Sequence, residues 1–402
     1  MQPALSLAYL LSQYPAINHA FMLREVRRLR ELGFRIEVAS VRAPDRPFDK
    51  LTPVEQEEAQ AAFYIKTRGM GGVLRAHLAT LFTRPAGYLR GLRCALGMGR
   101  SGILYFIEAV IAGQWMRRRQ LTHMHCHYSS TVGLIAARIF PISLSITFHG
   151  QAEFVDPKGN RLAEKIGASL FCRAISLYGS GEMRKATDSQ DWPKIEVTYL
   201  GVDPREFTPR PFRAAPDPFR IACVGQLAPV KGQQVLLAAI ELLAREGRRV
   251  HLRIAGDGPE RASLERDIAR RGLAGHVALE GFLNQDKLRE LYTATDVLAL
   301  PSLAEGLPVV LMEAMAMEIP CIASRITGIP EIIEHETDGL LVAPGDPVAL
   351  ARAIARLIDD AGLRQRMGQR GRRKILDKFD LQRNTEYLAG VFRRRLELTA
   401  AM

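Results

Sequence analysis

The sequence predicts an α/β protein made of two Rossmann-like domains that face each other across a deep cleft. Short aliphatic, β-branched runs alternate with helical patterns along both halves of the chain, which is typical of parallel sheets covered by helices. The 402 residues, 47% hydrophobic and 24% charged, suffice for two globular domains. A proline-rich stretch at 203–218, DPREFTPRPFRAAPDP, separates the two halves like a linker.

In the first half, the order strand, helix, strand is predicted over residues 4–41, from ALSLAYLL through AFMLREVRRLRELG to FRIEVASV. Two further strands, HMHCHYSS and SLSITFHG, lie on either side of the helix TVGLIAARIF. The N-terminal stretch has no basic region and no small-residue cleavage site, so we expect a first strand there rather than a signal peptide.

In the second half, helical patterns such as GQQVLLAAIELLAREG separate six β-rich runs. These runs are FRIACVGQL, VHLRIAGDG, HVALEGF, DVLALPS, PCIASR and GLLVAPG. The last helical pattern, QRNTEYLAGVFRRRLELTA, follows the second domain and is expected to pack back onto the first. We therefore expect an N-terminal domain at 1–205, completed by a helix at about 381–402, and a C-terminal domain at 206–380.

Composition excludes several protein classes. The five cysteines are scattered without a C-x-x-C pair, which favours a reduced, cytoplasmic protein over a disulfide scaffold or a zinc module. No uncharged apolar run is long enough to span a membrane, so we expect a soluble or peripheral protein. G-x-G-x-x-G and the P-loop pattern are both absent, which argues against a dinucleotide dehydrogenase.

The formal net charge of +12 is unevenly distributed. Residues 66–119 contain ten Lys or Arg and one acidic residue, Glu108, and the basic residues alternate with apolar ones at helical spacing. Such helices indicate a surface for anionic lipid at the inner face of the plasma membrane. Nucleic acid is not expected, because no nucleic-acid-binding motif accompanies the charge. An ordinary solvated basic face is the open alternative.

The stretch PSLAEGLPVVLMEAMAMEIP, residues 301–320, is mostly apolar but contains Glu305 and Glu313. A carboxylate out of water is costly unless it is paired or used. Pro308 is typical of a first helical turn, which puts Glu305 on the loop after the strand DVLAL. Glu313 then lies about 7 Å further in at 1.5 Å per residue.

The start of this helix is a natural phosphate site, because the amides of residues 307–310 are free and Gly306 lets a ligand approach. A carboxylate on each side of that site would bind hydroxyl groups on both sides of a diphosphate, which is the layout of a nucleotide sugar. The alternative is a loop glutamate plus an exposed helical glutamate.

Two other strand ends contain candidate ligand residues. Lys231 lies before a helix in VGQLAPVKGQQVLLAAI, where it is either a point charge for phosphate or a solvated loop lysine. Asp257, in AGDGPE, either caps the next helix or contacts the ligand.

Histidines gather at strand ends in the first half. His149 in SITFHG would hydrogen-bond a sugar hydroxyl or donate toward a developing charge; a structural histidine is the alternative. His123, His125 and His127 alternate in HMHCHY and so share one face of a strand. No carboxylate or cysteine cluster is evident near them, so no metal site is predicted. His127, nearest the strand end, is expected to line the cleft.

The chain resembles the retaining family 4 glycosyltransferases, which have the GT-B fold. In the second half the resemblance rests on VGQLAPVKG, AGDGPE, LPSLAEGLPVVLMEAMAMEIPCIAS, GIPEIIEHETDGLLVAPGD and MGQRGRRKILDKFD. In the first half, YLLSQYPAINHAFMLREVRRLRELGFRIEV, HMHCHYSS and TFHGQAEF resemble bacterial exopolysaccharide and colanic-acid enzymes.

The resemblance implies a retaining hexosyltransferase that needs no metal or other cofactor. Its N-terminal domain would bind the acceptor and its C-terminal domain the nucleotide sugar. Glu305 would bind the donor sugar, Lys231 the leaving diphosphate, and His149 the donor sugar from the opposite domain. Glu313 would bind the ribose hydroxyls, and the backbone near Phe282 the base. The implied donor-binding residues are Glu313, Gly306, Leu307, Pro308, Val309, Gln226, Gly225, Asp257, Phe282 and Leu283. Front-side attack is consistent with retention. Fixed hydrogen-bond donors would neutralise the charge on the leaving diphosphate, and domain closure would exclude water.

The chain departs from the family pattern at two places. Gln226 stands where the family usually has Arg, which removes a charge facing the diphosphate. Asn18 and His19 stand in a loop where relatives commonly have Ser-Glu, so the acceptor is in doubt; with His127 they are the implied acceptor-side residues.

Three functions remain open. The first is a retaining glycosyltransferase that uses a nucleotide-diphosphate-sugar and a lipid-linked saccharide acceptor in bacterial surface polysaccharide synthesis. The second is a catalytically weak or inactive nucleotide-sugar-binding protein, because of Gln226. The third is a GT-B enzyme with a soluble acceptor.

Overall fold

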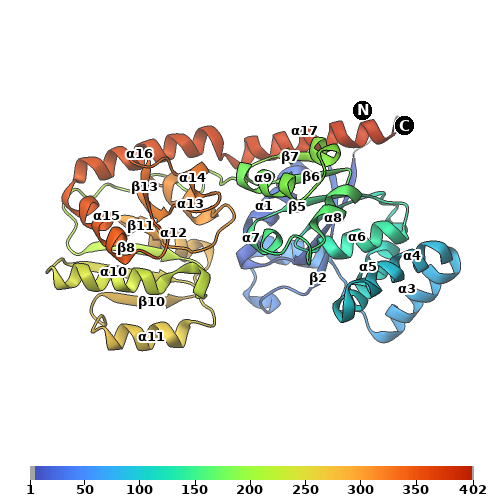
Figure 1. Ribbon diagram of the computed structural model, residues 1–402, viewed down its shortest axis with the longest axis horizontal. Coiled ribbons are helices and arrows are strands. Elements are labelled where there is room, and N and C mark those ends of the chain that lie inside the picture. Colours follow the sequence, from blue (N-terminus) through green and yellow to red (C-terminus); the bar gives the residue numbers. More distant parts are fainter. Residues whose placement is uncertain (1–4, 401–402) are drawn as a thin grey trace. The chain divides into compact units, whose positions relative to one another are not determined.

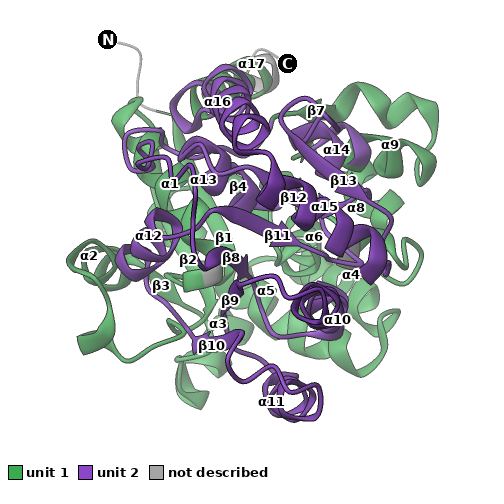
Figure 2. Ribbon diagram, turned by 90° about the vertical axis from the view of Figure 1, so that its left-hand side faces the viewer, with its two compact units in different colours: residues 1–175, 179–198, 385–402 green, residues 176–178, 199–384 purple. Residues whose placement is uncertain are grey.

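The computed structural model describes residues 5–400, without the side chains of residues 18, 151, 152 and 398–400. The chain forms two compact units, coloured separately in Figure 2. Unit 1 contains the residues up to Ile175, Gly179–Thr198 and those from Thr385 onward; unit 2 contains Ser176–Tyr178 and Tyr199–Asn384. Each unit is built on one parallel sheet, so the expected α/β class with two Rossmann-like domains is confirmed.

The sheet of unit 1 has seven parallel strands in the order β3-β2-β1-β4-β5-β6-β7. They are β1 (Ser6–Gln13), β2 (Arg35–Arg42), β3 (Phe63–Tyr64), β4 (His123–His127), β5 (Ser143–Phe148), β6 (Phe171–Ala174) and β7 (Ile195–Val197). The strand order reverses between β1 and β4, the position where open α/β sheets bind ligands. The sequence patterns predict only β1, β2, β4 and β5. Strands β3 and β7, with two and three residues, are too short to show a pattern, and the apolar run of β6 is interrupted by Arg173.

Helices cover the sheet of unit 1. Their bounds are α1 (Ala20–Glu31), α2 (Pro53–Ala61), α6 (Ser130–Ile139), α7 (Gln151–Phe154), α8 (Leu162–Ala168), α9 (Leu177–Lys185) and α17 (Leu381–Ala400). α1 buries Met22, Val26 and Leu29, which recur at helical spacing. α17 begins in unit 2, and Leu388 and Phe392 from its later part join the same core cluster of unit 1.

Residues 70–119 add three helices to unit 1: α3 (Met70–Thr83), α4 (Pro85–Leu96) and α5 (Gly99–Arg119), which pack on one another (Figure 1). α3 buries Ala76 and Thr80, and Thr80 Oγ1 accepts a hydrogen bond from Gln114 of α5 at 2.8 Å. Within residues 5–400, no helix is both long and apolar enough to cross a membrane.

The sheet of unit 2 has six parallel strands in the order β10-β9-β8-β11-β12-β13. They are β8 (Phe219–Val224), β9 (Val250–Ala255), β10 (Val277–Gly281), β11 (Val297–Leu300), β12 (Cys321–Ser324) and β13 (Gly339–Val342). The helices are α10 (Gln233–Arg245), α11 (Arg261–Arg270), α12 (Gln285–Thr293), α13 (Val309–Ala316), α14 (Ile329–Ile332), α15 (Pro347–Asp359) and α16 (Ala361–Lys378). The strand order reverses between β8 and β11.

The proline-rich segment 203–218 belongs to unit 2. Arg213 forms an ion pair with the buried Asp296 at 2.9 Å. The buried Arg364 of α16 donates hydrogen bonds to the carbonyls of Arg213 and Ala214 at 3.0 and 2.8 Å. These contacts hold the segment along the unit.

Candidate functional site

The candidate residues of unit 2 lie on the two loops that leave the sheet where its strand order reverses. One loop, 225–232, follows β8, and the other, 301–308, follows β11. The amide of Leu303 donates to the carbonyl of Val230 at 2.7 Å and so ties the loops together. The carboxyl ends of the strands at such a reversal are where doubly wound sheets bind ligands.

Lys231 and Glu305 meet across these loops. Lys231 Nζ lies 2.7 Å from Glu305 Oε1, and Ser302 Oγ donates to the same oxygen at 2.7 Å. Glu305 is 8% exposed, whereas the Lys231 side chain keeps a quarter of its surface in water. A buried carboxylate needs such partners. The lysine is therefore held at the site and still accessible to an anion.

A glycine permits this approach of the two loops. Gly232, which precedes α10, has a left-handed backbone with φ 66°. A Cβ atom at this position would lie 2.2 Å from the carbonyl oxygen of Pro301. Only glycine meets both conditions without strain.

The start of α13 lies directly after Glu305. Pro308 is the N-cap residue and the helix begins at Val309, one residue later than the sequence suggests. The amides of Leu307, Val309 and Val310 have no hydrogen-bond acceptor among residues 5–400. Free amides at a helix start attract anions. Gly306 and Leu307 precede the helix in this loop.

Glu313 is buried inside α13, with 5% of its surface exposed. Its Oε2 accepts a hydrogen bond from the Tyr292 hydroxyl at 3.0 Å, and its Oε1 lies 3.5 Å from Gln285 Nε2. Both partners belong to α12. Burial and the neighbouring Glu313 raise the pKa of Tyr292 well above its usual value. The alternative that Glu313 is an exposed helical glutamate is therefore wrong.

The other donor-side candidates of unit 2 are partly or fully exposed. Gln226 is exposed, and its carbonyl accepts from Gln233 Nε2 at 2.9 Å. Asp257 is exposed, and its Oδ1 accepts from the amide of Gly258 at 2.8 Å, so it closes a turn after β9. Phe282 is exposed and Leu283 half-buried after the edge strand β10. Gly225, directly after β8, is half-buried.

In unit 1 the loops after β1 and β4 meet where the strand order reverses. His19 ends a short 3-10 helix, Ile17–His19, and its ring stacks on Tyr128 with centroids 4.9 Å apart. Tyr128 in turn stacks on His149 at 4.3 Å. The side chain of Asn18 lies outside the described residues. The three rings thus line the carboxyl ends of β1, β4 and β5.

The histidines of β4 form a buried ladder against β5. His123 bonds Ser143 and Ser145 at 2.7 and 2.8 Å, and His125 bonds Ser145 and Thr147 at 2.7 and 2.9 Å. Burial lowers the pKa of His123 to about 3. A neutral imidazole can bridge two hydroxyls because it has one donor and one acceptor.

His127 continues the ladder to His149: His127 Nδ1 lies 2.9 Å from His149 Nε2. On its other side, His127 Nε2 lies 3.4 Å from Oε1 of Glu25, a buried residue of α1. Glu25 also forms a close ion pair with Arg173 of β6. Burial alone would raise the pKa of Glu25, but Arg173 and then His127 lower it well below its usual range.

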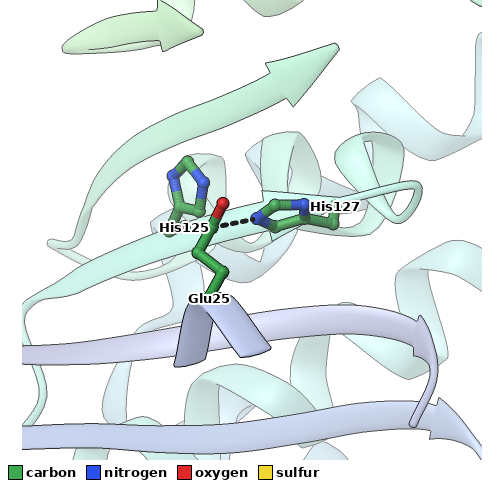
Figure 3. Close-up of side chains that lie close together, drawn as sticks. All are labelled: Glu25, His125 and His127. Carbon is green, nitrogen blue, oxygen red and sulfur yellow. Dashed lines mark ion pairs between the residues drawn. The ribbon is translucent and has the colours of Figure 1, made fainter. Parts of the chain in front are cut away.

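Glu25, His125 and His127 are near enough to hold a metal ion, with ligand atoms within 4.8 Å of one another (Figure 3). The donor set does not fit a cation well. Both ring nitrogens of His125 already bond hydroxyls. The two Glu25 oxygens accept from Arg173 and from the Tyr9 hydroxyl, the latter at 3.3 Å. The arginine supplies the positive charge that a metal would bring.

Sequence reasoning missed Glu25, Tyr128, Ser302 and Tyr292. Glu25 leaves one signal: it falls among Met22, Val26 and Leu29, on the apolar face of its helix. An acidic residue on that face must be paired. Tyr128 and Tyr292 leave no such signal, because their partners come from other elements.

Comparisons with known proteins agree with this fold. Residues 204–374 match the family model described as "Glycosyl transferases group 1". The chain is 26% identical over 373 residues to the "Putative colanic acid biosynthesis glycosyltransferase WcaL" of Escherichia coli (strain K12), covering 87% of this chain and 90% of the relative. It is 38% identical over 170 residues to the "Amylovoran biosynthesis glycosyltransferase AmsK" of Erwinia amylovora, covering 41% of this chain and 42% of that one.

Two solved structures share the fold. Anabaena Alr3699/HepE in complex with UDP and glucose aligns with a TM-score of 0.75 at 19% identity, covering 97% of this chain and 100% of that one. Sucrose-phosphate synthase from Thermosynechococcus elongatus aligns with a TM-score of 0.76 at 18% identity, covering 99% and 100%. These likenesses show the fold, two Rossmann-like domains of the GT-B type.

Proposed function

We propose that this chain, whose residues 204–374 match the family model "Glycosyl transferases group 1", is a retaining hexosyltransferase of bacterial surface polysaccharide synthesis. Its donor would be a nucleotide-diphosphate-sugar and its acceptor a lipid-linked saccharide. The observation that carries the proposal is the Lys231–Glu305 pair beside the free amides of α13. A cation and a carboxylate at one phosphate-binding helix start suit a sugar diphosphate.

In the proposed reaction, the bond between the anomeric carbon and the diphosphate oxygen breaks, and its electron pair goes to the diphosphate. Lys231 and the amides of Leu307 and Val309 stabilise that charge. The acceptor oxygen attacks from the same face, and its proton passes to the leaving phosphate oxygen. Glu305 orients the donor sugar. This scheme needs no metal, and we expect turnover to persist with a chelator present.

The remaining donor contacts are proposed from their positions in unit 2. Glu313, held by Tyr292 and Gln285 on α12, would accept hydrogen bonds from the ribose hydroxyls. The backbone of Phe282 and Leu283, after β10, would contact the base. Gly225, Gln226 and Asp257, at the ends of β8 and β9, would line the diphosphate side.

In unit 1, His149 would contact the donor sugar, and Asn18, His19 and His127 would belong to the acceptor side. The printed names of two relatives, in colanic acid and amylovoran biosynthesis, support a polysaccharide product. The neutral, aromatic lining formed by His19, Tyr128 and His149 is suited to sugar rings.

We also propose that helices α3–α5 bind the anionic inner face of the plasma membrane. Large apolar side chains cover the outer face of α3, where Leu74 is 59% and Phe82 80% exposed. Its inner face carries only small or polar residues such as Ala76 and Thr80. Exposed arginines of the same segment, among them Arg75 and Arg90, complement anionic headgroups.

Transfer assays test the donor site. UDP-glucose, GDP-mannose and ADP-glucose are first ranked by thermal shift, since a ligand at a hundred times its Kd adds about 2.7 kcal/mol. With the most stabilising donor, we expect Lys231→Met and Glu305→Gln to lower turnover at least tenfold. Glu290→Gln, which removes an exposed charge of α12, is the matched control. Full activity of both site variants would refute the assignment. Retention would be refuted if the anomeric proton coupling constant showed that the product has the opposite anomeric configuration to the donor.

Vesicle flotation tests the membrane surface. We expect wild type to float with phosphatidylglycerol vesicles but not with phosphatidylcholine. The double variant Leu74→Gln, Phe82→Gln and the triple neutralisation of Arg117, Arg118 and Arg119 should both float less. Val155→Gln, which changes another strongly exposed apolar residue, is the control. The idea fails if wild type ignores anionic vesicles.

A second function follows from Gln226. Without the arginine usual at this position, the chain would bind nucleotide sugars but not turn them over. Tight nucleotide binding without transfer to any of a broad acceptor panel would favour that reading.

A further inference from the structure

Three side chains of unit 1, Glu25, His127 and His149, form a buried chain that ends at the carboxyl edge of the sheet. We propose that Glu25 and His127 are positioning residues that hold His149 with an unprotonated Nδ1, which accepts a hydrogen bond from a saccharide hydroxyl. That the ligand is a saccharide rests on the proposed function above, whereas the protonation state of His149 does not depend on it.

The first link is fixed by charge. Glu25 forms a buried ion pair with Arg173, so its carboxylate is ionised. Glu25 Oε1 lies 3.4 Å from His127 Nε2, which makes no hydrogen bond of good geometry among the described residues. The charge on this oxygen still favours hydrogen on Nε2, because two facing lone pairs would repel each other. His127 is therefore protonated at Nε2.

The second link follows from the first. Burial lowers the pKa of His127 in spite of the neighbouring Glu25, and Arg173 already neutralises that carboxylate. A neutral His127 with hydrogen on Nε2 has a lone pair on Nδ1. His149 Nε2, 2.9 Å away, must then donate to it. Since burial also keeps His149 neutral by lowering its pKa, its Nδ1 carries the lone pair.

The ring of His149 is held from several sides. Its face stacks on Tyr128, and Phe21 lies with its centroid 5.3 Å away. The amides of His149 and Gly150 both donate to Glu153 Oε2, at 2.8 and 3.3 Å. These contacts fix the orientation of the His149 ring and the position of its backbone.

His149 Nδ1 itself is buried and has no hydrogen-bond partner among the described residues. A buried acceptor atom without a hydrogen-bond partner costs free energy until a donor binds to it. Phosphate oxygens at neutral pH offer few hydrogens, whereas every free sugar hydroxyl offers one. The lone pair therefore selects a hydroxyl group and disfavours an anion.

Glu25→Gln should reverse the direction of these hydrogen bonds. The amide oxygen of the new side chain should accept the hydrogen bond from Arg173, because a guanidinium can only donate. The amide nitrogen then faces His127 Nε2 and donates to it, which moves the His127 hydrogen to Nδ1. His127 now donates to His149 Nε2, and His149 Nδ1 becomes protonated. A ligand hydroxyl then meets a donor instead of an acceptor.

Nitrogen-15 NMR of histidine-labelled full-length protein tests the proposal. His149→Asn assigns the His149 signals. In wild type we expect hydrogen on Nε2 only, in Glu25→Gln on Nδ1 only, and in His127→Leu a mixture. His123→Leu is the matched control, because His123 is equally buried on the same strand but bonds only serines; it should leave the His149 signals unchanged.

Transfer from the selected sugar nucleotide gives the second readout. We expect kcat/KM to fall ten- to a hundredfold in Glu25→Gln and less than threefold in His123→Leu. Hydrogen on Nδ1 in wild type, or an unchanged His149 in both Glu25→Gln and His127→Leu, overturns the proposal even if the enzyme is active. Failure of the donor site would appear instead as full activity of Glu305→Gln and Lys231→Met, with the NMR result intact.

Discussion

Substituting Glu305 by glutamine is expected to tighten nucleoside diphosphate binding while it slows sugar transfer. In the free protein, Lys231 Nζ lies 2.7 Å from Glu305 Oε1, so a diphosphate must compete with a carboxylate for the lysine. Glutamine keeps the size of the side chain and can still accept from Ser302, but it releases the cation. The same change removes the carboxylate that we propose orients the donor sugar.

The size of the effect follows from the exposure of the pair. At 2.7 Å, Coulomb's law gives about 1.5 kcal/mol in water and about 6 kcal/mol at an effective dielectric of 20. The Lys231 side chain is a quarter exposed, and desolvation offsets part of the gain. We expect nucleotide binding to become more favourable by about 0.7–1.4 kcal/mol, which corresponds to a three- to tenfold lower Kd.

Isothermal titration with UDP, or with GDP or ADP if thermal shift selects one of them, measures this change. Lys231→Met should weaken binding by a similar factor, and Glu290→Gln should leave it within twofold because this charge is exposed on α12. The reasoning is refuted if Glu305→Gln weakens nucleotide binding as strongly as Lys231→Met does. The carboxylate would then support binding instead of competing for the lysine.

Three further changes probe other parts of the structure. Gly232→Ala adds a Cβ atom 2.2 Å from the Pro301 carbonyl oxygen and should lower both the melting temperature and transfer, whereas Gly247→Ala, also left-handed but in open space, should cost only about 1–2 kcal/mol of backbone strain. Gln226→Arg adds a charge to an exposed loop position and should lower the Kd for UDP three- to tenfold; an equal gain in Gln234→Arg would point to net charge alone. Burial raises the pKa of Glu153 to about 7, so the folded state keeps a proton that the unfolded chain releases, and stability should fall as pH rises from about 4.5 to about 7. Differential scanning calorimetry of Glu153→Gln should show a smaller loss over that range, and an identical loss would contradict this origin.

Much of the architecture was accessible from hydrophobic periodicity. The longer strands, such as β1 and β8, carry aliphatic runs bounded by turn residues, and the helices between them show clear apolar spacing. Strands of two or three residues, such as β3 and β7, contain too few positions to show a period. They exist because the neighbouring strand offers hydrogen bonds, which is tertiary information.

The candidate site was also only partly predictable from the sequence. Glu305 and Lys231 stand out in the sequence because each lies between a strand and a helix. Their contact with each other does not, because it depends on the adjacency of β8 and β11, two strands separated by β9 and β10 in the chain. Glu25 and Arg173 are further apart still, and only the packing of α1 on the sheet joins them. The roles of all these residues stay predictions.

Helix α17 has a consequence for how the protein is made. Its ring at Phe392 lies 5.0 Å from the ring of His125 and packs in the core of unit 1, yet it follows all of unit 2 in the chain. During translation, the face of the unit 1 sheet that contains His125 stays uncovered until more than 180 later residues have been synthesised. Unit 2 is nearly continuous in sequence and needs no such late segment. The usual order, in which the N-terminal domain folds first during synthesis, is therefore expected to be reversed here.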